Sequence, residues 1–137
     1  MQPITFLPWA WRETFNADAA DPRFPEEHRN DLDLSGYRVE AVDGHIGSID
    51  RASYEVGNSW VVVDTGPWIF GRKVLLPAGT VRNVDHAERK VYVDRTKDQI
   101  KRSPEYDEHT FGTDDYRRQV GDYYTTSYRD EQEHVLR

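Results

Sequence analysis

The sequence predicts a small, mainly β domain, a barrel or a sandwich, with an extended N-terminal arm and a short C-terminal helical strap. Short apolar or alternating runs recur about every 8–12 residues through the middle of the chain, a spacing typical of compact β folds. Turn dipeptides separate these runs, and no helical period interrupts them. The chain has 137 residues, a length that fits one domain.

The first predicted hairpin begins at Tyr37. Residues 37–41 alternate between apolar and polar side chains, as in a half-buried strand. Asp43-Gly44 follows, and this dipeptide favours a tight turn because both residues tolerate positive φ. A second alternating run begins at Ile46.

A second turn is predicted at Gly57-Asn58, followed by a strand with consecutive apolar positions. Residues 60–63 read Trp-Val-Val-Val, so both faces of this strand should be covered. Three further strands are predicted at residues 73–76, 80–84 and 90–93. A module of about 65 residues buries only about 60% of its unfolded surface, so we expect another surface to pack against it.

Residues 1–33 follow neither a strand nor a helix period and are punctuated by proline. They predict an arm that lies on another surface rather than a folded unit. The arm either folds back on its own barrel or lies on a neighbouring molecule.

Two helices are predicted in the tail. Thr96 and Gln99 have the spacing of a capping box, and Pro104 ends that helix.

Thr113 can cap the second helix. Gly121 weakens the second helix by about 1 kcal/mol relative to alanine, so it needs a surface to lie on. We expect the chain to fray from Thr125. The apolar face of this helix follows i, i+4 and i+7/8 spacing, at Tyr116, Val120, Tyr123 and Tyr124.

The composition excludes several functions. With 18 Lys+Arg against 25 Asp+Glu the net charge is −7, which argues against direct nucleic-acid binding, since this needs a basic surface. The chain has no cysteine, so disulfides, thiol catalysis and thiolate metal sites are excluded. No apolar run approaches the length of a membrane span, and no signal peptide is recognisable. We therefore expect a cytoplasmic protein without a membrane span.

Asp64-Thr65-Gly66 is the string that most resembles a catalytic motif. After an apolar strand it is similar to the signature of aspartic proteases, and a homodimer would bring two such carboxylates together. The apolar segment that supports the catalytic loop in those enzymes lies far downstream, whereas Ile69-Phe70-Gly71 follows here within the same loop. The alternative is an aspartate that ends a strand at a glycine turn, which we favour.

No metal or cofactor site is predicted. Residues 31–36 imitate the start of a calcium loop, but the twelfth position is Val42 instead of a bidentate glutamate. His86-Ala87-Glu88 resembles half of a zinc deaminase motif whose cysteines are absent. No nucleophile motif or phosphate-binding loop occurs. The sequence thus indicates no catalytic residue.

Aromatic residues are the candidate functional residues. Large aromatics in loops need cover, and exposed apolar clusters mark partner surfaces. Three arrangements are open: burial within the chain by the arm and the tail helix, self-association, or a foreign partner. The candidate interaction surface comprises Trp9, Trp11, Trp68, Phe70, Tyr116, Tyr123 and Tyr124.

Three motifs in the middle of the chain are recognisable together. They are residues 34–39, 43–49 and 64–77, which read Leu-Ser-Gly-Tyr-Arg-Val, Asp-Gly-His-Ile-Gly-Ser-Ile and Asp-Thr-Gly-Pro-Trp-Ile-Phe-Gly-Arg-Lys-Val-Leu-Leu-Pro. With these motifs the middle of the chain resembles the PRC-barrel family, named after the H subunit of the photosynthetic reaction centre. The similarity extends through residues 91–100 to Pro104, and the end of the tail resembles the strap of stand-alone members.

The resemblance implies a small β-barrel used for protein contacts rather than catalysis. The family's settings are a reaction-centre cap, a ribosome maturation factor and archaeal cell-division adaptors. We expect an arm at residues 1–33, a PRC-type barrel at residues 34–96, and a helical strap with a frayed tail at residues 97–137.

The function expected from the sequence is that of a non-enzymatic adaptor that self-associates as a homodimer. Another protein is the second partner considered, and no cofactor is expected. A dimer burying about 800 Å² per subunit would cover the apolar strand. The alternatives are a homodimeric acid protease that uses Asp64, and a barrel that binds a small ligand. Ribosome association is a further alternative within the adaptor class.

Overall fold

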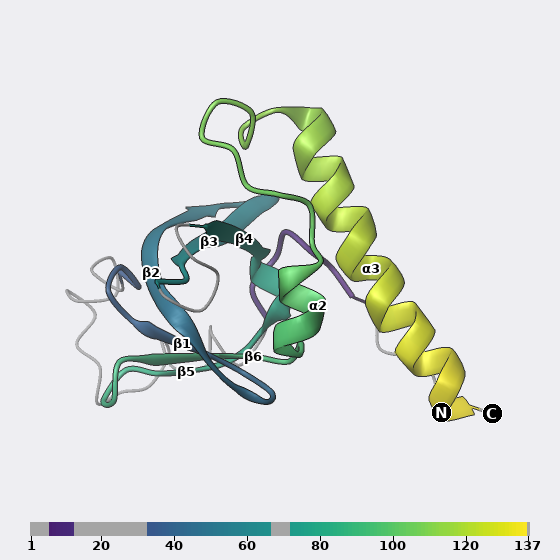
Figure 1. The fold of residues 1–137 in the computed structure, drawn as a ribbon, viewed down its shortest axis with the longest axis horizontal. Coiled ribbons are helices and arrows are strands. Elements are labelled where there is room, and N and C mark those ends of the chain that lie inside the picture. Colours follow the sequence, from purple (N-terminus) through teal and green to yellow (C-terminus); the bar gives the residue numbers. More distant parts are fainter. Residues whose placement is uncertain (1–5, 13–32, 67–71, 137) are drawn as a thin grey trace.

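The computed structural model describes residues 6–12, 33–66 and 72–136, and the side chains of the last helix up to Glu131. Six strands form one sheet in the order β4-β3-β2-β1-β6-β5, and the C-terminal helix lies beside it (Figure 1). The fold is therefore mainly β, as predicted. The strands are β1 (Arg38–Ala41), β2 (Gly44–Glu55), β3 (Asn58–Asp64), β4 (Lys73–Pro77), β5 (Val81–Asp85) and β6 (Lys90–Val93).

The two predicted hairpins are confirmed. Strands β1 and β2 pair antiparallel with Ala41 opposite Gly44, whose φ of 143° suits glycine. Strands β2 and β3 pair with Glu55 opposite Asn58, and Gly57 in the turn between them has a φ of 79°. The turns themselves are Val42-Asp43 and Val56-Gly57, each one residue before the predicted dipeptide.

The six strands form an open sheet, which corrects the expectation of a closed barrel. Strands β4 and β5 are its two ends, and the order of pairing does not join them to each other among the described strands. The short 3-10 helix η2 (Ala78–Thr80) connects β4 directly to β5. The two strands are therefore neighbours in the sequence but are not paired in the sheet. The sheet curves strongly around its apolar face (Figure 1).

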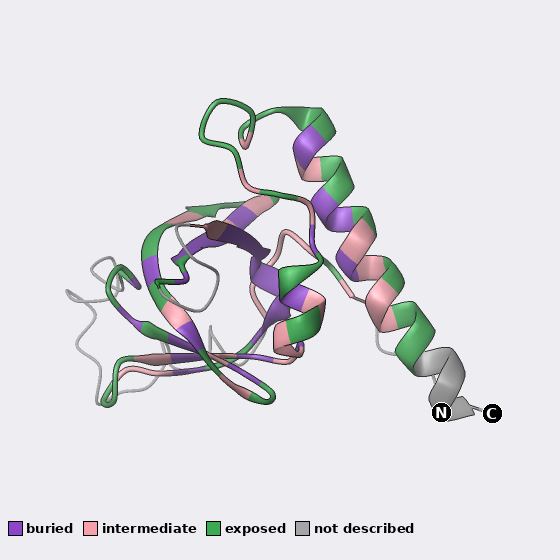
Figure 2. Ribbon diagram, viewed as in Figure 1, coloured by how far each residue is buried: buried purple, intermediate pink, exposed green. Residues whose placement is uncertain are grey.

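The apolar run in β3 is covered within the chain. Val61, Val62 and Val63 are fully buried, as the consecutive apolar pattern predicted. Figure 2 shows buried positions along the sheet and on the helix beside it. Aromatic side chains from outside the sheet pack against this core, so the burial of β3 does not by itself require a dimer. These side chains include Phe6, Trp9 and Trp11 from the arm, Tyr106 and Phe111 from the following loop, and Tyr123 and Tyr128 from the last helix.

Both predicted helices are present, and the second is longer than expected. In α2 (Lys97–Lys101) Thr96 and Gln99 form the capping box. Thr113 Oγ1 accepts a hydrogen bond from the Tyr116 N–H at 3.2 Å, at the start of α3 (Asp114–Leu136). The expectation of a short strap that frays from Thr125 was wrong, because α3 continues to Leu136. Neither helix is long and apolar enough to cross a bilayer within the described part of the chain.

Candidate interaction site

Residues 6–12, hereafter the arm segment, lie between the sheet and α3 (Figure 1). One side of this segment contacts β3, η2 and the end of β6, and the other side contacts α3. The arm therefore folds back on its own chain over these residues. We define the arm-binding site by the residues that hold it: Ser59, Gly79, Asp94, Gly121 and Tyr128.

Main-chain hydrogen bonds hold the arm segment on the sheet side. The Gly79 N–H donates to the Pro8 carbonyl at 2.9 Å, and the Ser59 N–H donates to the Trp9 carbonyl at 3.2 Å. In the opposite direction, Arg12 Nε donates to the Gly79 carbonyl at 2.8 Å. Within the segment, the Ala10 N–H donates to the Leu7 carbonyl at 3.4 Å, so the backbone turns at this point. The sheet side of the site therefore holds a turn-containing segment through two of its carbonyls and the side chain of Arg12.

Two glycines make room for the arm segment. A Cβ on Gly79 would lie 2.2 Å from the Leu7 carbonyl oxygen, and a Cβ on Gly121 would lie 3.2 Å from Trp9 Nε1. Gly79 is the middle residue of η2, and Gly121 lies within α3. The glycine that weakens α3 is therefore also the position where the indole of Trp9 packs on the helix.

Aromatic and charged side chains hold the two ends of the segment. The ring of Phe6 stacks on Tyr128 with centroids 4.3 Å apart. At the other end, Arg12 Nη2 donates to Asp94 Oδ2 at 2.7 Å. The side chain of Arg12 is 33% exposed and that of Asp94 is 26% exposed. Shielding from solvent makes such a charge-assisted hydrogen bond stronger than a surface pair.

Arg95 joins the same network from below the ring of Tyr128. Its guanidinium lies 3.6 Å from the ring centroid, it donates to Ser127 Oγ at 3.1 Å, and it pairs with Glu131. Arg95 is only 3% exposed, so its charge is compensated by the carboxylates of Asp94 and Glu131 and by the ring. This network fastens α3 to the end of β6.

The hydroxyl of Tyr128 donates to Asp94 Oδ1. Burial, and next the hydrogen bond to the Asp94 carboxylate, raise the pKa of Tyr128, because both disfavour a phenolate at this position. The tyrosine therefore stays a hydrogen-bond donor to Asp94 well above neutral pH.

The predicted aromatic residues divide into three groups. Trp9 and Trp11 lie half-buried in the arm segment, and Trp11 stacks on Tyr54 with centroids 5.7 Å apart. Tyr116 and Tyr124 are buried in the core, at 7% and 0% exposure. The face of α3 that carries them packs inward against the core, so of the three arrangements left open these two tyrosines follow burial within the chain.

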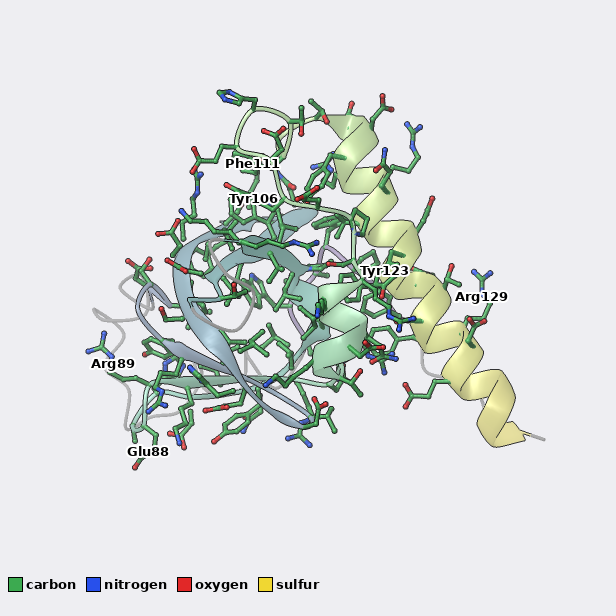
Figure 3. The ribbon with its side chains drawn as sticks, viewed as in Figure 1. Glu88, Arg89, Tyr106, Phe111, Tyr123 and Arg129 are labelled. Carbon is green, nitrogen blue, oxygen red and sulfur yellow. The ribbon has the colours of Figure 1, made fainter. Side chains whose placement is uncertain are left out.

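Tyr123 is half-buried and faces α2 (Figure 3), where its hydroxyl donates to the Gln99 carbonyl. Trp68 and Phe70 lie outside the described residues. The structure therefore brings Trp9 together with the helix that carries Tyr123 and Tyr124, as the arrangement with burial inside the chain required.

Sequence reasoning missed most of the arm-binding site. Tyr128 continues the series of Tyr116, Val120 and Tyr124 by one further step of four residues. The prediction that the chain frays from Thr125 left Tyr128 outside the helix. No local pattern marked Gly79 or Asp94, since their roles depend on contacts with a segment far away in the sequence.

A second surface feature lies at the start of α3. The loop before this helix packs on the sheet through Phe111, whose ring lies edge-on to Trp60 at 5.6 Å, and through Tyr106, which accepts a hydrogen bond from Arg51 at 2.9 Å (Figure 3). Between this loop, β4 and α3 is an open hollow of about 1280 Å³. Carboxylates dominate its lining, at Glu105, Asp107, Glu108 and Asp115, beside Arg72, Lys73 and Tyr116.

Asp64 lies at the exposed end of β3, where Oδ1 accepts a hydrogen bond from the Gly66 N–H at 3.0 Å. Gly66 has a φ of 55°, so these residues form a glycine turn of the kind expected for the non-catalytic alternative. Within residues 6–12, 33–66 and 72–131, no group of three or more histidine or acidic side chains is placed to hold a metal ion.

The solved structures that are similar to this chain include one described as a "putative 16S ribosomal RNA processing protein RimM" from Pseudomonas aeruginosa, with 29% sequence identity and a TM-score of 0.41. The similarity covers 47% of this chain and 42% of that protein, so the chain matches less than half of its length. No family model and no curated protein matches the chain.

Proposed function

We propose that this protein is a non-enzymatic interaction module of the PRC-barrel type that binds a short segment of a partner protein. The observation that carries the proposal is the arm-binding site. It holds the arm segment through main-chain donors at Ser59 and Gly79, an aromatic contact at Tyr128 and a carboxylate at Asp94. Main-chain hydrogen bonds combined with contacts to particular side chains are a recurring way in which protein domains recognise peptides.

The PRC-barrel assignment is supported by the motifs at residues 34–39, 43–49 and 64–77 and by the predominance of β structure. Homodimer formation and a cytoplasmic location stay predictions. Light scattering over micromolar concentrations tests the dimer.

Photo-crosslinking in the native host tests the interaction site. A photoreactive amino acid replaces Arg117, whose guanidinium lies 6.0 Å from the ring of Trp9, in the full-length chain. The control position is Glu88, an exposed residue on the β5–β6 turn at the other end of the molecule (Figure 3).

We expect a discrete crosslinked partner from position 117 and none from position 88. Identical products from both positions, or none from position 117 in cells that express the protein at its natural level, would contradict the proposal.

A further inference from the structure

We propose that the arm segment is a displaceable ligand of its own chain, and that the partner carries a segment of the same chemistry. That segment has an aromatic residue, a tryptophan three positions later and an arginine three positions further on, matching Phe6, Trp9 and Arg12. The inference rests on the proposed function and names the partner's recognition element.

The spacing of the three residues follows from the positions of their contacts, and we call Phe6, Trp9 and Arg12 the anchors of the segment. Phe6 stacks on Tyr128, Trp9 packs on Gly121, and Arg12 reaches Asp94. Each anchor meets a different chemical environment: a ring, an open helix backbone and a carboxylate.

A competing segment would have to reproduce all three contacts in one register, because the main-chain bonds at Pro8 and Trp9 fix that register. Main-chain bonds give affinity, and the anchors give specificity.

The arm segment can leave without disrupting the sheet. All six strands pair with one another, and none pairs with residues 6–12. The side chains of the segment are only half-buried, and Leu7 is 60% exposed. The ladders between the strands therefore do not depend on the segment, although the Ser59 and Gly79 N–H groups lose their partners when it leaves.

The covalent link favours the arm over a free competitor. A segment that is covalently linked to its own binding site has an effective concentration on the order of millimolar. A partner segment of equal intrinsic affinity therefore binds the intact chain much more weakly than it binds a chain whose arm has been disabled. The arm acts as an internal competitor.

Fluorescence polarisation of a labelled synthetic peptide with the sequence of residues 4–14 tests this inference. It is titrated with the full-length wild type, with Trp9→Ala, and with Trp9→Ala/Gly121→Leu, in which the new side chain fills the position of the indole. A control peptide carries Trp9→Ala and Arg12→Ala. Circular dichroism checks that each variant is folded, and Arg12→Ala replaces Trp9→Ala if the latter is unfolded.

We expect the peptide to bind Trp9→Ala at least tenfold more tightly than it binds the wild type. The Gly121→Leu change and the control peptide should each abolish this binding. Equal binding to wild type and Trp9→Ala, binding that survives Gly121→Leu, or no binding to any folded variant would each overturn the inference. If a photoreactive residue at position 117 still crosslinks a partner in that case, the proposed interaction function is retained. Only the proposal that the arm competes with the partner is then rejected.

Discussion

The indole of Trp9 lies against the backbone of Gly121, so close that a Cβ at this glycine would lie 3.2 Å from Nε1. A residue that costs helix stability is thereby used to bring the first aromatic segment of the chain onto the last helix. The balance between these two effects can be measured.

Gly121→Ala should have opposite effects in two backgrounds. In the Trp9→Ala variant we expect it to stabilise the protein by about 1 kcal/mol, because alanine is the better helix former. In the wild type the contact with the indole should cancel or reverse this gain. Chemical denaturation of the four proteins in the double-mutant cycle gives the coupling, and additive effects would show that the contact has no energetic consequence.

Arg12→Ala should destabilise the protein by about 1–3 kcal/mol, since it removes the closer of the two arginines that pair with the partly buried carboxylate of Asp94. The matched control is Arg102→Ala. Arg102 pairs with Asp98 at 3.2 Å, but both side chains are at least two-thirds exposed, so a loss below about 1 kcal/mol is expected. Equal losses in urea denaturation would contradict the role of the Arg12–Asp94 pair.

Stability should fall at high pH. Burial raises the pKa of Tyr116 to about 12 and also raises the pKa of Tyr124. The folded state then holds protons that the unfolded chain releases near pH 10, so stability is complete below about pH 10 and declines above it. Denaturation midpoints from pH 8 to 11.5 measure this decline, and Tyr116→Phe should make it shallower. A pH-independent midpoint would contradict burial of these hydroxyls.

Gly79→Ala should displace the arm segment, because the new Cβ would meet the Leu7 carbonyl oxygen at 2.2 Å. We expect faster hydrogen exchange at the amides of Ser59 and residue 79, which bond to the arm, while amides in the β2–β3 ladder stay protected. Unchanged exchange at Ser59 would show that the arm tolerates the substitution.

Asp64→Asn tests the protease alternative. We expect no cleavage of fluorogenic peptides between pH 4 and 6 by either the wild type or the variant, since Asp64 forms a glycine turn with Gly66. Cleavage by the wild type that the variant lacks would establish the enzyme instead.

The strands and caps could be predicted from the sequence because local chemistry determines them. The glycine of Asp43-Gly44 and Gly57 both have a positive φ, which favours glycine. Thr96 and Gln99 form the capping box at the start of α2. The open order of the sheet and the length of α3 could not be predicted from the sequence, since both depend on tertiary contacts. Arg95, Ser127 and Glu131 stabilise the later turns of α3, and their partners become visible only in the fold.

The bond between Arg12 and Tyr128 spans 116 positions of sequence. During synthesis the arm emerges early, but its binding site is incomplete until α3 has been made. Until α3 has been made, Phe6 lacks the ring of Tyr128 and Trp9 lacks the backbone of Gly121. Docking of the arm is a late event in maturation, one that waits for the far end of the domain.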